Sequence, residues 1–367
     1  MRKFKVGFGC LKSQANTDNA ELNGIDASLV EELQSCVSSV VGKPALEINR
    51  PGGFGRPVFQ VGFDDATYVF SKRSTLDAAR KEAAVLRALG YTGHVPRLKA
   101  QADRWIIQEH CPGERLSVLL DGAQQMPERE NAVSTAIKGL LETADATRSA
   151  GLDAWLPVIG AEPGWHVKRL SAANRLSQTL SIPAPDVDLD VLVDAMSGPR
   201  DSFIKFDARP GNALIQGPSC VWVDWEDCGF GRALEDLAFL ICDEWMPLDG
   251  AGEERLISQW LPHFKGADSI DNARRALTIY GVTHMLIRLH MAFTHRLQSG
   301  AWWDRAECLS SDLTGNTAEE MRRLCDRIIR WSEPVAELRP YRAWVNIIID
   351  IVESSANHST LVDRNAA

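Results

Sequence analysis

The sequence predicts a two-lobed α+β fold, with a small β-rich N-terminal lobe (N-lobe) and a larger, mostly helical C-terminal lobe (C-lobe). The chain has 367 residues, more than one compact domain usually holds. Strand-like runs separated by turn residues are concentrated before residue 112, and helical runs follow from about residue 115. We therefore expect an irregular segment 1–25, an N-lobe 26–112, a C-lobe 113–360 and a tail 361–367, with the join near 109–114.

Composition limits the class of partner. The net charge of −9 disfavours binding to nucleic acid or to an anionic membrane, because both require basic patches. The eight cysteines include no C-x-x-C pair, and this scatter is typical of reduced thiols in a cytoplasmic protein. No apolar run approaches the ~18 residues of a membrane span. We expect a cytoplasmic protein, and the composition says little about a small-molecule partner.

The N-lobe is predicted to contain two helices around a small sheet. Residues 26–42 have apolar residues at helical spacing, with Asp26 as the N-cap and a closing glycine. β-rich runs joined by turn residues follow, and residues 76–90 are good helix formers that end at Gly90. Residues 95–114, "VPRLKAQADRWIIQEHCPGE", then predict two more strands.

The C-lobe is predicted to be helical except for two short strands. The strand-like pieces are "SFIKF" (202–206) and "CVWVDW" (220–225). Residues 151–200 mix proline-containing linkers with two helices, "VKRLSAANRLSQTL" and "DVDLDVLVDAM". Residues 270–356 are almost entirely helical, and no internal repeat is evident.

A glycine-rich stretch, "RPGGFGRP", lies between two predicted strands of the N-lobe. Gly52, Gly53 and Gly55 allow the backbone to approach a polyphosphate closely and to offer N–H groups to it. A glycine-rich hairpin can also be only a turn. Further along, Lys72 ends a predicted strand and Glu82 lies on the next helix.

Lys72 is predicted to hold phosphate oxygens, with Glu82 orienting it through an ion pair. Lys72 shares its strand face with Tyr68 and Phe70, whereas Arg73 points to the other face and is the second choice for this role. Two solvated surface charges would be the alternative interpretation of Lys72 and Glu82.

The loop "KFDARPGNAL" places a carboxylate and a carboxamide close together. Asp207 can accept the proton of a substrate hydroxyl group, or orient that group toward a phosphate. Asn212 can give its amide oxygen to Mg²⁺, which prefers oxygen ligands. Pro210 and Gly211 would shape the turn between them, although the same pattern also fits a simple Asx turn.

A second carboxylate, Asp224, follows a short apolar strand, as expected for a metal ligand at a strand end. It begins a dense acidic run in which Arg232 is the one base between residues 221 and 250. Such a run fits a magnesium–nucleotide or a cationic substrate better than a plain surface. The acids are Asp224, Glu226, Asp227, Glu235, Asp236, Asp243, Glu244 and Asp249.

Phosphoryl transfer requires a loop over the phosphates, a cation, a base and metal ligands. Each of these parts has a candidate here, and the candidates occur in a consistent order along the chain. The motifs "KFDARPGN", "VDWE" and "GRALEDLA" resemble H-G-D-x-x-x-x-N, I-D-W-E and G-x-x-x-x-D-L-A of the aminoglycoside phosphotransferase and choline kinase-like family. The resemblance covers residues 27–250 and implies a protein-kinase-like fold, ATP or GTP, Mg²⁺ and a small-molecule hydroxyl acceptor.

Carried over by motif, the resemblance implies that Asp207 is the catalytic base and that Asn212 and Asp224 are the Mg²⁺ ligands. The stretch "QEHCPGE" is similar to the family's hinge, where the backbone of Glu109 and Cys111 would bind adenine. The family motif has a histidine two residues before the catalytic aspartate and a glycine one residue before it. This chain has Lys205 and Phe206 at these two positions. A charged lysine cannot accept a hydrogen bond, so this loop must be braced differently.

The acceptor is left open by the sequence. Glu226, Asp227, Asp243 and Glu244 follow the metal motif and can attract an ammonium group, as in an aminoglycoside, choline or amino alcohol. Arg288, which shares a helical face with His284 and His295, can equally favour a carboxylate. Both sets also fit an ordinary polar helix face or core histidines, and Trp302 and Trp303 fit either ring stacking or the core.

The leading hypothesis is an ATP-dependent small-molecule kinase. Lys205 and Phe206 motivate an alternative, a nucleotide-binding pseudokinase that acts as a regulatory or interaction module. A metal-dependent hydrolase built on the acidic run would leave the β-rich lobe unexplained. Protein-kinase activity is disfavoured because no A-P-E segment is recognisable.

Overall fold

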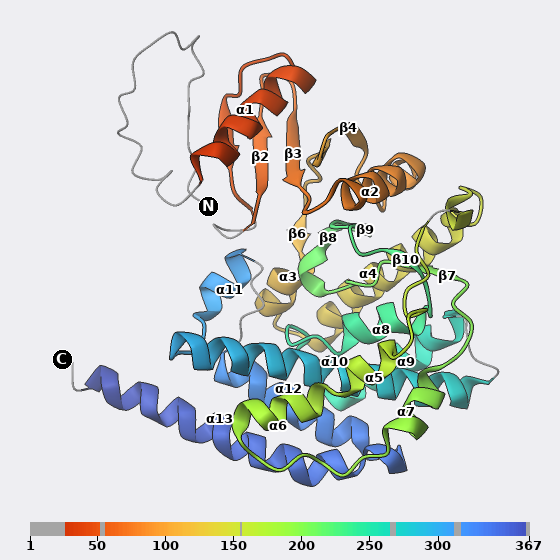
Figure 1. Cartoon of the computed structure of the whole chain (residues 1–367), viewed down its shortest axis with the longest axis vertical. Coiled ribbons are helices and arrows are strands. Elements are labelled where there is room, and N and C mark those ends of the chain that lie inside the picture. The colour runs from red at the N-terminus through yellow and green to blue at the C-terminus, as the bar shows by residue number, and fades with distance from the viewer. Residues whose placement is uncertain (1–25, 52–55, 155, 265–268, 312–316, 365–367) are drawn as a thin grey trace.

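The computed structural model shows the two unequal lobes that the sequence predicts (Figure 1). It describes residues 26–51, 56–154, 156–264, 269–311 and 317–364. The predicted phosphate loop residues Gly52, Gly53 and Gly55 and the segment 1–25 lie outside the described residues.

The N-lobe is built on a five-stranded antiparallel sheet in the order β1-β2-β3-β5-β4. Helix α1 precedes the sheet in the chain, and α2 connects β3 to β4. The bounds are α1 (Ala27–Val40), β1 (Glu47–Asn49), β2 (Val58–Gly62), β3 (Thr67–Lys72), α2 (Leu76–Leu89), β4 (Leu98–Ala102) and β5 (Trp105–Glu109).

Alternation along β5 assigns the two helices to opposite faces of this sheet. Trp105 and Ile107 pack in one apolar cluster with Leu33 of α1, whereas Ile106 packs in another with Leu86 of α2. Successive strand residues point to opposite faces, so α1 and α2 cover different sides. Asp26 caps α1 as predicted, because its side chain accepts from the Ser28 N–H.

Helix α2 belongs to the N-lobe, and its buried face packs into the apolar core of the C-lobe. Its buried residues Ala79, Ala83 and Leu86 belong to the large apolar cluster that continues through the C-lobe helices. Thr75 caps its N-terminus by accepting from the Ala78 N–H at 3.1 Å. The side that α2 covers is therefore the side of the sheet that faces the rest of the molecule.

The chain passes into the C-lobe between the end of β5 and β6 (Glu114–Arg115). Strand β6 pairs with β8 (Ala213–Gln216), which forms a hairpin with β9 (Ser219–Trp222). A second small sheet pairs β7 (Ser202–Ile204) with β10 (Gly229–Gly231). The β7–β8 and β9–β10 loops each connect the two small sheets, and these loops carry the catalytic and metal motifs.

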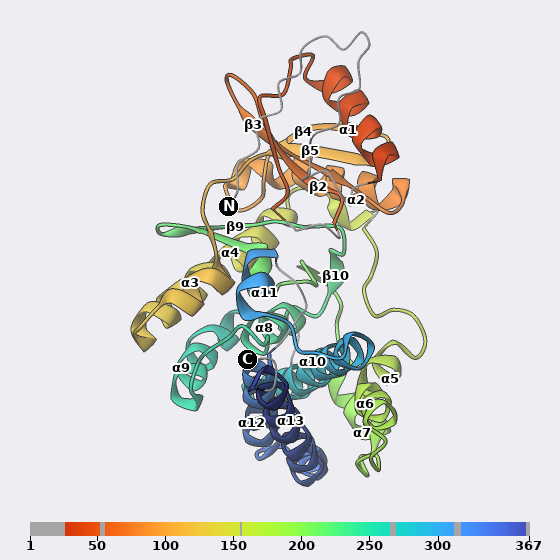
Figure 2. The ribbon, with the colours of Figure 1, turned by 90° about the vertical axis from the view of Figure 1, so that its left-hand side faces the viewer.

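The C-lobe helices pack around a long central helix, α10, against which α6, α8 and α12 lie. Figure 2 shows α6, α7, α12 and α13 at the end of the molecule farthest from the N-lobe. The helices are α3 (Leu116–Gly122), α4 (Met126–Thr147), α5 (Trp165–Leu170), α6 (Ala172–Leu180), α7 (Leu189–Met196), α8 (Leu234–Ile241), α9 (Gly250–Trp260), α10 (Ile270–Ser299), α11 (Arg305–Ser311), α12 (Ala318–Ser332) and α13 (Pro340–Arg364).

Several predicted elements differ from the structure in detail, among them the strand expected over 220–225, which ends at Trp222. The helix expected over 167–180 is broken at Ser171, whose hydroxyl group accepts from Arg175 and donates to the Lys168 carbonyl. The strand expected over 202–206 ends at Ile204, because Phe206 has a left-handed φ of 69°. In the described part of the chain, no helix combines the length and the apolar character needed to cross a bilayer.

Candidate active site

Asp207 lies in the loop between β7 and β8, where both oxygens of its carboxylate accept hydrogen bonds. The Arg209 Nε donates to Oδ1 at 3.1 Å, and the Asn212 Nδ2 donates to Oδ2 at 2.7 Å. Asn212 also donates to the Asp207 backbone carbonyl at 3.0 Å. The side chain of Asp207 is 29% exposed, so the carboxylate is held in position yet reachable from solvent.

Lys205 braces this loop from below. Its buried ammonium group donates to the backbone carbonyls of Asp207 at 2.9 Å and of Asp224 at 2.7 Å. The ammonium group also lies 5.6 Å from the centre of the Trp225 ring, within reach of a cation–π interaction. Lysine therefore connects the catalytic loop to the metal motif by donating two bonds.

Asp236 of α8 anchors the same loop through its backbone. Its two carboxylate oxygens accept from the N–H groups of Lys205 at 2.8 Å and Phe206 at 2.7 Å. Burial raises the pKa of Asp236 to about 7, against the effect of these two bonds. Asp236, which the sequence shows only as one acid of the dense run, is a buried support of the catalytic loop.

Asn212 lies beside the loop of Asp224 because its backbone is hydrogen-bonded to Val223, the residue before Asp224. The Val223 N–H donates to the Asn212 carbonyl at 2.9 Å, and Ala213 pairs with Trp222 in the hairpin. Asp224 has a left-handed φ of 64° and a side chain that is 32% exposed. Since the Asn212 nitrogen is engaged with Asp207, its oxygen is the atom available to a cation.

The donor set fits Mg²⁺, a hard cation that takes one or two protein oxygens together with phosphate and water oxygens. It consists of the Asn212 amide oxygen and the Asp224 carboxylate. In the described ranges, no three histidine, cysteine, aspartate or glutamate side chains gather as a metal site by themselves. A cation here would thus depend on a phosphate-bearing ligand for the rest of its coordination.

The predicted ion pair between Lys72 and Glu82 is wrong. Glu82, which is fully buried, receives a two-pronged contact from Arg73, through Nε and through Nη2 at 2.7 Å. The Arg73 guanidinium also lies 3.1 Å from Asp224 Oδ1 and 3.6 Å from Glu226 Oε2. Arg73, the second choice from the sequence, is the cation that faces the metal motif.

Strand alternation explains this correction. Lys72 shares its face with Phe70, which packs in the α1 cluster, and its ammonium group pairs with Glu32 of α1. Arg73 follows the strand on the α2 face, where Glu82 lies. Glu82 further accepts from the Trp225 N–H at 3.4 Å, so α2 touches the metal motif directly.

At the predicted hinge, the N–H of Glu109 is used inside the sheet, where it donates to the Arg97 carbonyl at 3.0 Å. The Glu109 side chain accepts from the Arg97 N–H at 3.1 Å. A purine at this edge would have to use the carbonyl of Glu109 and the backbone of Cys111. The expected contacts to the purine are made by backbone atoms, so the side chains of Glu109 and Cys111 do not affect them.

The acids after Asp224 divide into two groups. Glu226 and Asp227 lie beside the site, and burial together with neighbouring carboxylates raises the pKa of both. Asp243 and Glu244 are fully buried. Glu244 receives a two-pronged contact from Arg288, and Asp243 Oδ1 accepts from the Trp245 N–H at 3.1 Å.

The burial of Asp243 and Glu244 corrects the prediction that they attract an acceptor's ammonium group. Arg288 is likewise buried and serves Glu244, so it is not presented to a ligand. His284 is buried against Phe239, with ring centres 4.3 Å apart, and burial lowers its pKa well below the ordinary value. His295 stacks on Trp303 at 4.0 Å, away from this group.

The charge state of Asp207 is set by its surroundings. Burial alone would raise its pKa, but the charges of Arg209, Lys205 and Arg288 and the bond from Asn212 lower the pKa to about 2. The carboxylate is therefore ionised at physiological pH, as a proton acceptor must be.

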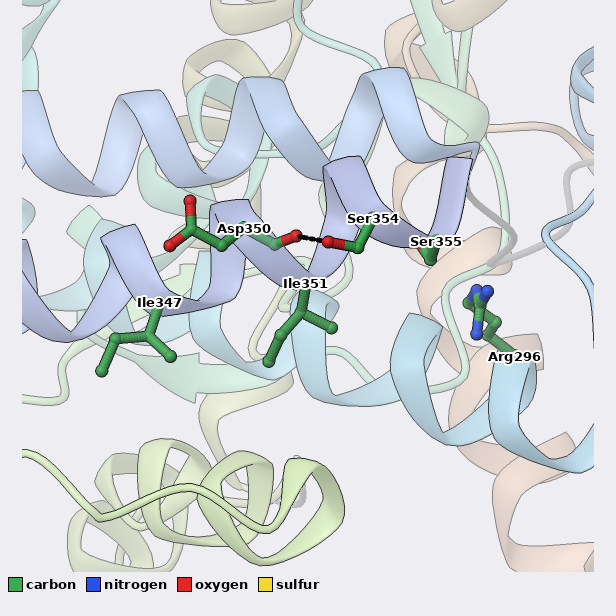
Figure 3. A pocket seen from close by; sticks show the side chains of 6 residues that line it. All are labelled: Arg296, Ile347, Asp350, Ile351, Ser354 and Ser355. Atoms are coloured by element: carbon green, nitrogen blue, oxygen red, sulfur yellow. Dashed lines mark hydrogen bonds between the residues drawn. The ribbon is translucent and has the colours of Figure 1, made fainter. Parts of the chain in front are cut away.

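A groove of about 570 Å³ lies elsewhere, between α10 and α13 (Figure 3). Ile347 and Ile351 of α13 form its apolar part, and Arg296 of α10 lies at one end. None of the residues from the Asp207 or Asp224 loops lines it. The groove therefore has no part in the chemistry of those loops.

Comparison with protein families identifies the chain. Residues 48–270 match the model of the phosphotransferase enzyme family, which covers more than half of the chain. The chain belongs to this family. No curated protein matches the chain.

Solved structures share the fold. A candidate aminoglycoside phosphotransferase from Ralstonia eutropha JMP134 is 14% identical, with a TM-score of 0.53 over 86% of this chain and 98% of that one. A choline/ethanolamine kinase family protein from Mesorhizobium loti is 15% identical, with a TM-score of 0.52 over 86% and 99%. A thermostable mutant of the aminoglycoside phosphotransferase APH(4)-Ia, in a ternary complex with ADP and hygromycin B, is 15% identical, with a TM-score of 0.50 over 81% and 97%.

Proposed function

We propose that the chain is a magnesium-dependent kinase that transfers the γ-phosphate of ATP or GTP to a hydroxyl group of a small molecule. The observation that carries the proposal is the Lys205 ammonium group, which holds the Asp207 and Asp224 carbonyls together while Asn212 binds the Asp207 carboxylate. Family membership supports the reaction class. The relative that binds ADP and hygromycin B supports a nucleotide and a hydroxyl-bearing acceptor as the two substrates.

Asp207 acts as the base in this proposal. Its ionised carboxylate accepts the proton of the acceptor hydroxyl group while the hydroxyl oxygen forms a bond to the γ-phosphorus. The bond from that phosphorus to the β–γ bridging oxygen breaks, and the nucleoside diphosphate leaves. Arg209 and Asn212 hold the carboxylate in one orientation, which is how positioning lowers the barrier.

The nucleotide is held mainly by the N-lobe. Arg73 replaces Lys72 as the proposed phosphate ligand, because its guanidinium is fixed by Glu82 and directed at Asp224. Because Nε and Nη2 bind Glu82, Nη1 and the outer N–H of Nη2 are the groups that would reach phosphate oxygens. Mg²⁺, held by Asn212 and Asp224, would neutralise charge on the phosphates. Gly52, Gly53 and Gly55 would cover the phosphates, and the Glu109–Cys111 backbone would bind the purine.

The test is the Asp207→Asn variant in a nucleotide-consumption assay with a panel of small alcohols. Deleting a general base costs about 10²–10⁴ in rate, whereas Mg–ATP affinity should change little. Asp201→Asn, the same change at an exposed aspartate just before β7, is the matched control. Turnover by Asp207→Asn at the rate of the control would remove Asp207 from the mechanism.

One observation favours the pseudokinase alternative. Arg73 lies 3.1 Å from Asp224 Oδ1, so a cationic side chain already contacts a proposed metal ligand. A pseudokinase would be stabilised thermally by nucleotide, by RT ln(1 + [L]/Kd), but would form no phosphorylated product with any acceptor. A phosphorylated product that depends on Asp207 would exclude this alternative.

A further inference from the structure

The acceptor site is the part of the proposed function that the family does not define, and this inference depends on that function. Two of the four acids expected to attract a cation, Asp243 and Glu244, are unsuitable, because they are buried and bonded inside the C-lobe. The other two, Glu226 and Asp227, follow Asp224 in the β9–β10 loop. On the α5 side of the catalytic loop a cationic side chain, Arg169, packs on Phe206.

Arg169 of α5 lies directly against the catalytic loop. The carbon centre of its guanidinium is 5.3 Å from the ring of Phe206 and 5.3 Å from the ring of Phe239. Phe206 immediately precedes Asp207, and its ring also packs on Trp165 at 5.8 Å and on Phe239 at 5.3 Å. A guanidinium on two aromatic faces is held by cation–π attraction, which leaves its N–H edge free to bind.

Within the described chain, Arg169 has an ion pair with Glu235 through Nη1 at 3.7 Å, but its other N–H groups make no hydrogen bond. The side chain is 10% exposed, and its buried Nε and Nη2 have no hydrogen-bond partner among the described residues. Trp165 has a buried Nε1 in the same state. Burying a donor without a partner costs about 1–3 kcal/mol, so three such donors on one short helix indicate a missing acceptor atom.

The local charge balance also favours an anion. Burial and the charges of Arg200, Arg169 and Arg232 lower the pKa of His166, so this imidazole is neutral. The same three guanidinium groups act on the buried acid Glu235, whose carboxylate lies 3.7 Å from Arg169 Nη1, longer than a hydrogen bond, and burial raises the pKa of Glu235. Glu235 and its buried neighbour Asp236 are thus two acids beside three guanidinium groups, which leaves an excess of positive charge.

The backbone supports the same conclusion. Phe206 adopts a φ of 69°, where the family motif has glycine. A bulky side chain in this region is strained, and such strain persists mainly where a site uses it. Here it accompanies an aromatic ring, one residue before Asp207, that packs against the guanidinium of Arg169.

We propose that Arg169, with the Trp165 Nε1, binds an anionic group of the acceptor, so that the substrate is an alcohol that also carries a carboxylate or phosphate group. The rings of Phe206 and Phe239 form the surface between this anion and the hydroxyl group that Asp207 deprotonates. Aminoglycosides, choline and other cationic alcohols would be poor acceptors.

The test compares hydroxy acids with their uncharged amides: glycolate, glycerate, 4-hydroxybutyrate and gluconate with the corresponding carboxamides. Glycerol 3-phosphate with glycerol tests the phosphate source, and choline with kanamycin tests cations. Phosphorylation is followed by nucleotide consumption, and binding is followed separately by thermal shift without nucleotide. We expect an acid, but not its amide, to be phosphorylated and to stabilise the protein.

Arg169→Met keeps the aliphatic packing on the two rings and removes the charge. Losing a hydrogen bond to a charged group should raise the acceptor KM about 10- to 100-fold, with kcat changed much less. Lys168→Gln, at an exposed position of the same helix, is the charge-matched control and should behave as wild type. Trp165→Phe removes one donor and keeps a ring, so it serves if Arg169→Met does not fold.

Two results would overturn the proposal. One is a neutral or cationic acceptor whose KM is unchanged by Arg169→Met and by Trp165→Phe. The other is equal thermal stabilisation of wild type and variant by every acid in the panel. If acids bind through Arg169 but no compound is phosphorylated, the proposed kinase activity fails while the anion site stands. If a compound is phosphorylated equally well by wild type and Arg169→Met, the kinase activity stands and the anion site fails.

Discussion

The replacement of Lys205 tests how the catalytic loop is held. The Lys205 side chain is buried and donates to the carbonyls of Asp207 and Asp224 at 2.9 and 2.7 Å. Lys205→Met keeps most of the aliphatic volume but removes the donor to the Asp224 carbonyl and leaves the Asp207 carbonyl with the bond from Asn212 alone. An unsatisfied buried group costs about 1–3 kcal/mol and a lost hydrogen bond about 1 kcal/mol, and the burial of the ammonium group offsets part of this. We expect a net loss of about 1–3 kcal/mol in the free energy of unfolding.

The effect on activity should exceed the effect on substrate binding. Lys205 contacts backbone atoms and not the reacting groups, so its loss lets the Asp207 and Asp224 loops shift relative to each other. A misplacement of about 1 Å can cost about 10²-fold in rate. Urea denaturation gives the stability, and steady-state kinetics with an acceptor identified from the proposed panel give kcat and KM.

Lys205→His, which restores the residue of the family motif, is the rescue variant. Its ring N–H can donate to one of the two carbonyls, so its kcat should lie between those of wild type and Lys205→Met. The bracing role is refuted if Lys205→Met retains kcat within about threefold and stability within about 0.5 kcal/mol, the range typical of surface substitutions.

Two further predictions concern Arg73 and the buried His166. Arg73→Ala should raise the KM for nucleotide at least about tenfold, because it removes a charge-assisted contact to the phosphates. Lys72→Ala loses only the pair with Glu32 and should leave this KM unchanged. Equal effects of the two variants would contradict the assignment of Arg73 as the phosphate ligand. Burial and the charges of Arg200, Arg169 and Arg232 lower the pKa of His166 from 6.5 to about 4. Its contribution to stability is therefore present above pH 6.5 and is lost as the pH falls toward 4, by up to about 3 kcal/mol. In His166→Gln the free energy of unfolding should fall less steeply as the pH drops through this range. The remaining slope is due partly to His284, whose pKa burial also lowers. An unchanged slope would exclude His166 as a source of the pH dependence.

Local sequence signals predicted the helices and the catalytic loop well. The Asp26 cap of α1 and the run of helix formers in α2 depend on neighbours in the chain, and both helices form where predicted. The Asp207 and Asn212 pair was also predictable, because the two residues share one short loop and bond to each other directly.

Features set by distant partners were not predictable. The choice between Lys72 and Arg73 depends on which sheet face α2 covers, and strand alternation alone does not say this. In the sequence, Glu244 belongs to an acidic run that suggests a ligand-facing surface. In the folded chain it pairs in the core with Arg288, which comes from the distant helix α10. Arg169 gave no signal, because its environment of Phe206 and Phe239 forms only in the folded chain.

The metal site is the central claim, and Mn²⁺ binding measured by electron paramagnetic resonance tests it most directly. Mn²⁺ replaces Mg²⁺, and its free signal is titrated with protein in the presence and absence of ADP. We predict binding that requires ADP and weakens at least about tenfold in Asn212→Ala and in Asp224→Ala, while the Asp201→Asn control binds as wild type. Mn²⁺ binding that needs no nucleotide, or that persists unchanged in both alanine variants, would contradict the assignment of these two residues as the metal ligands.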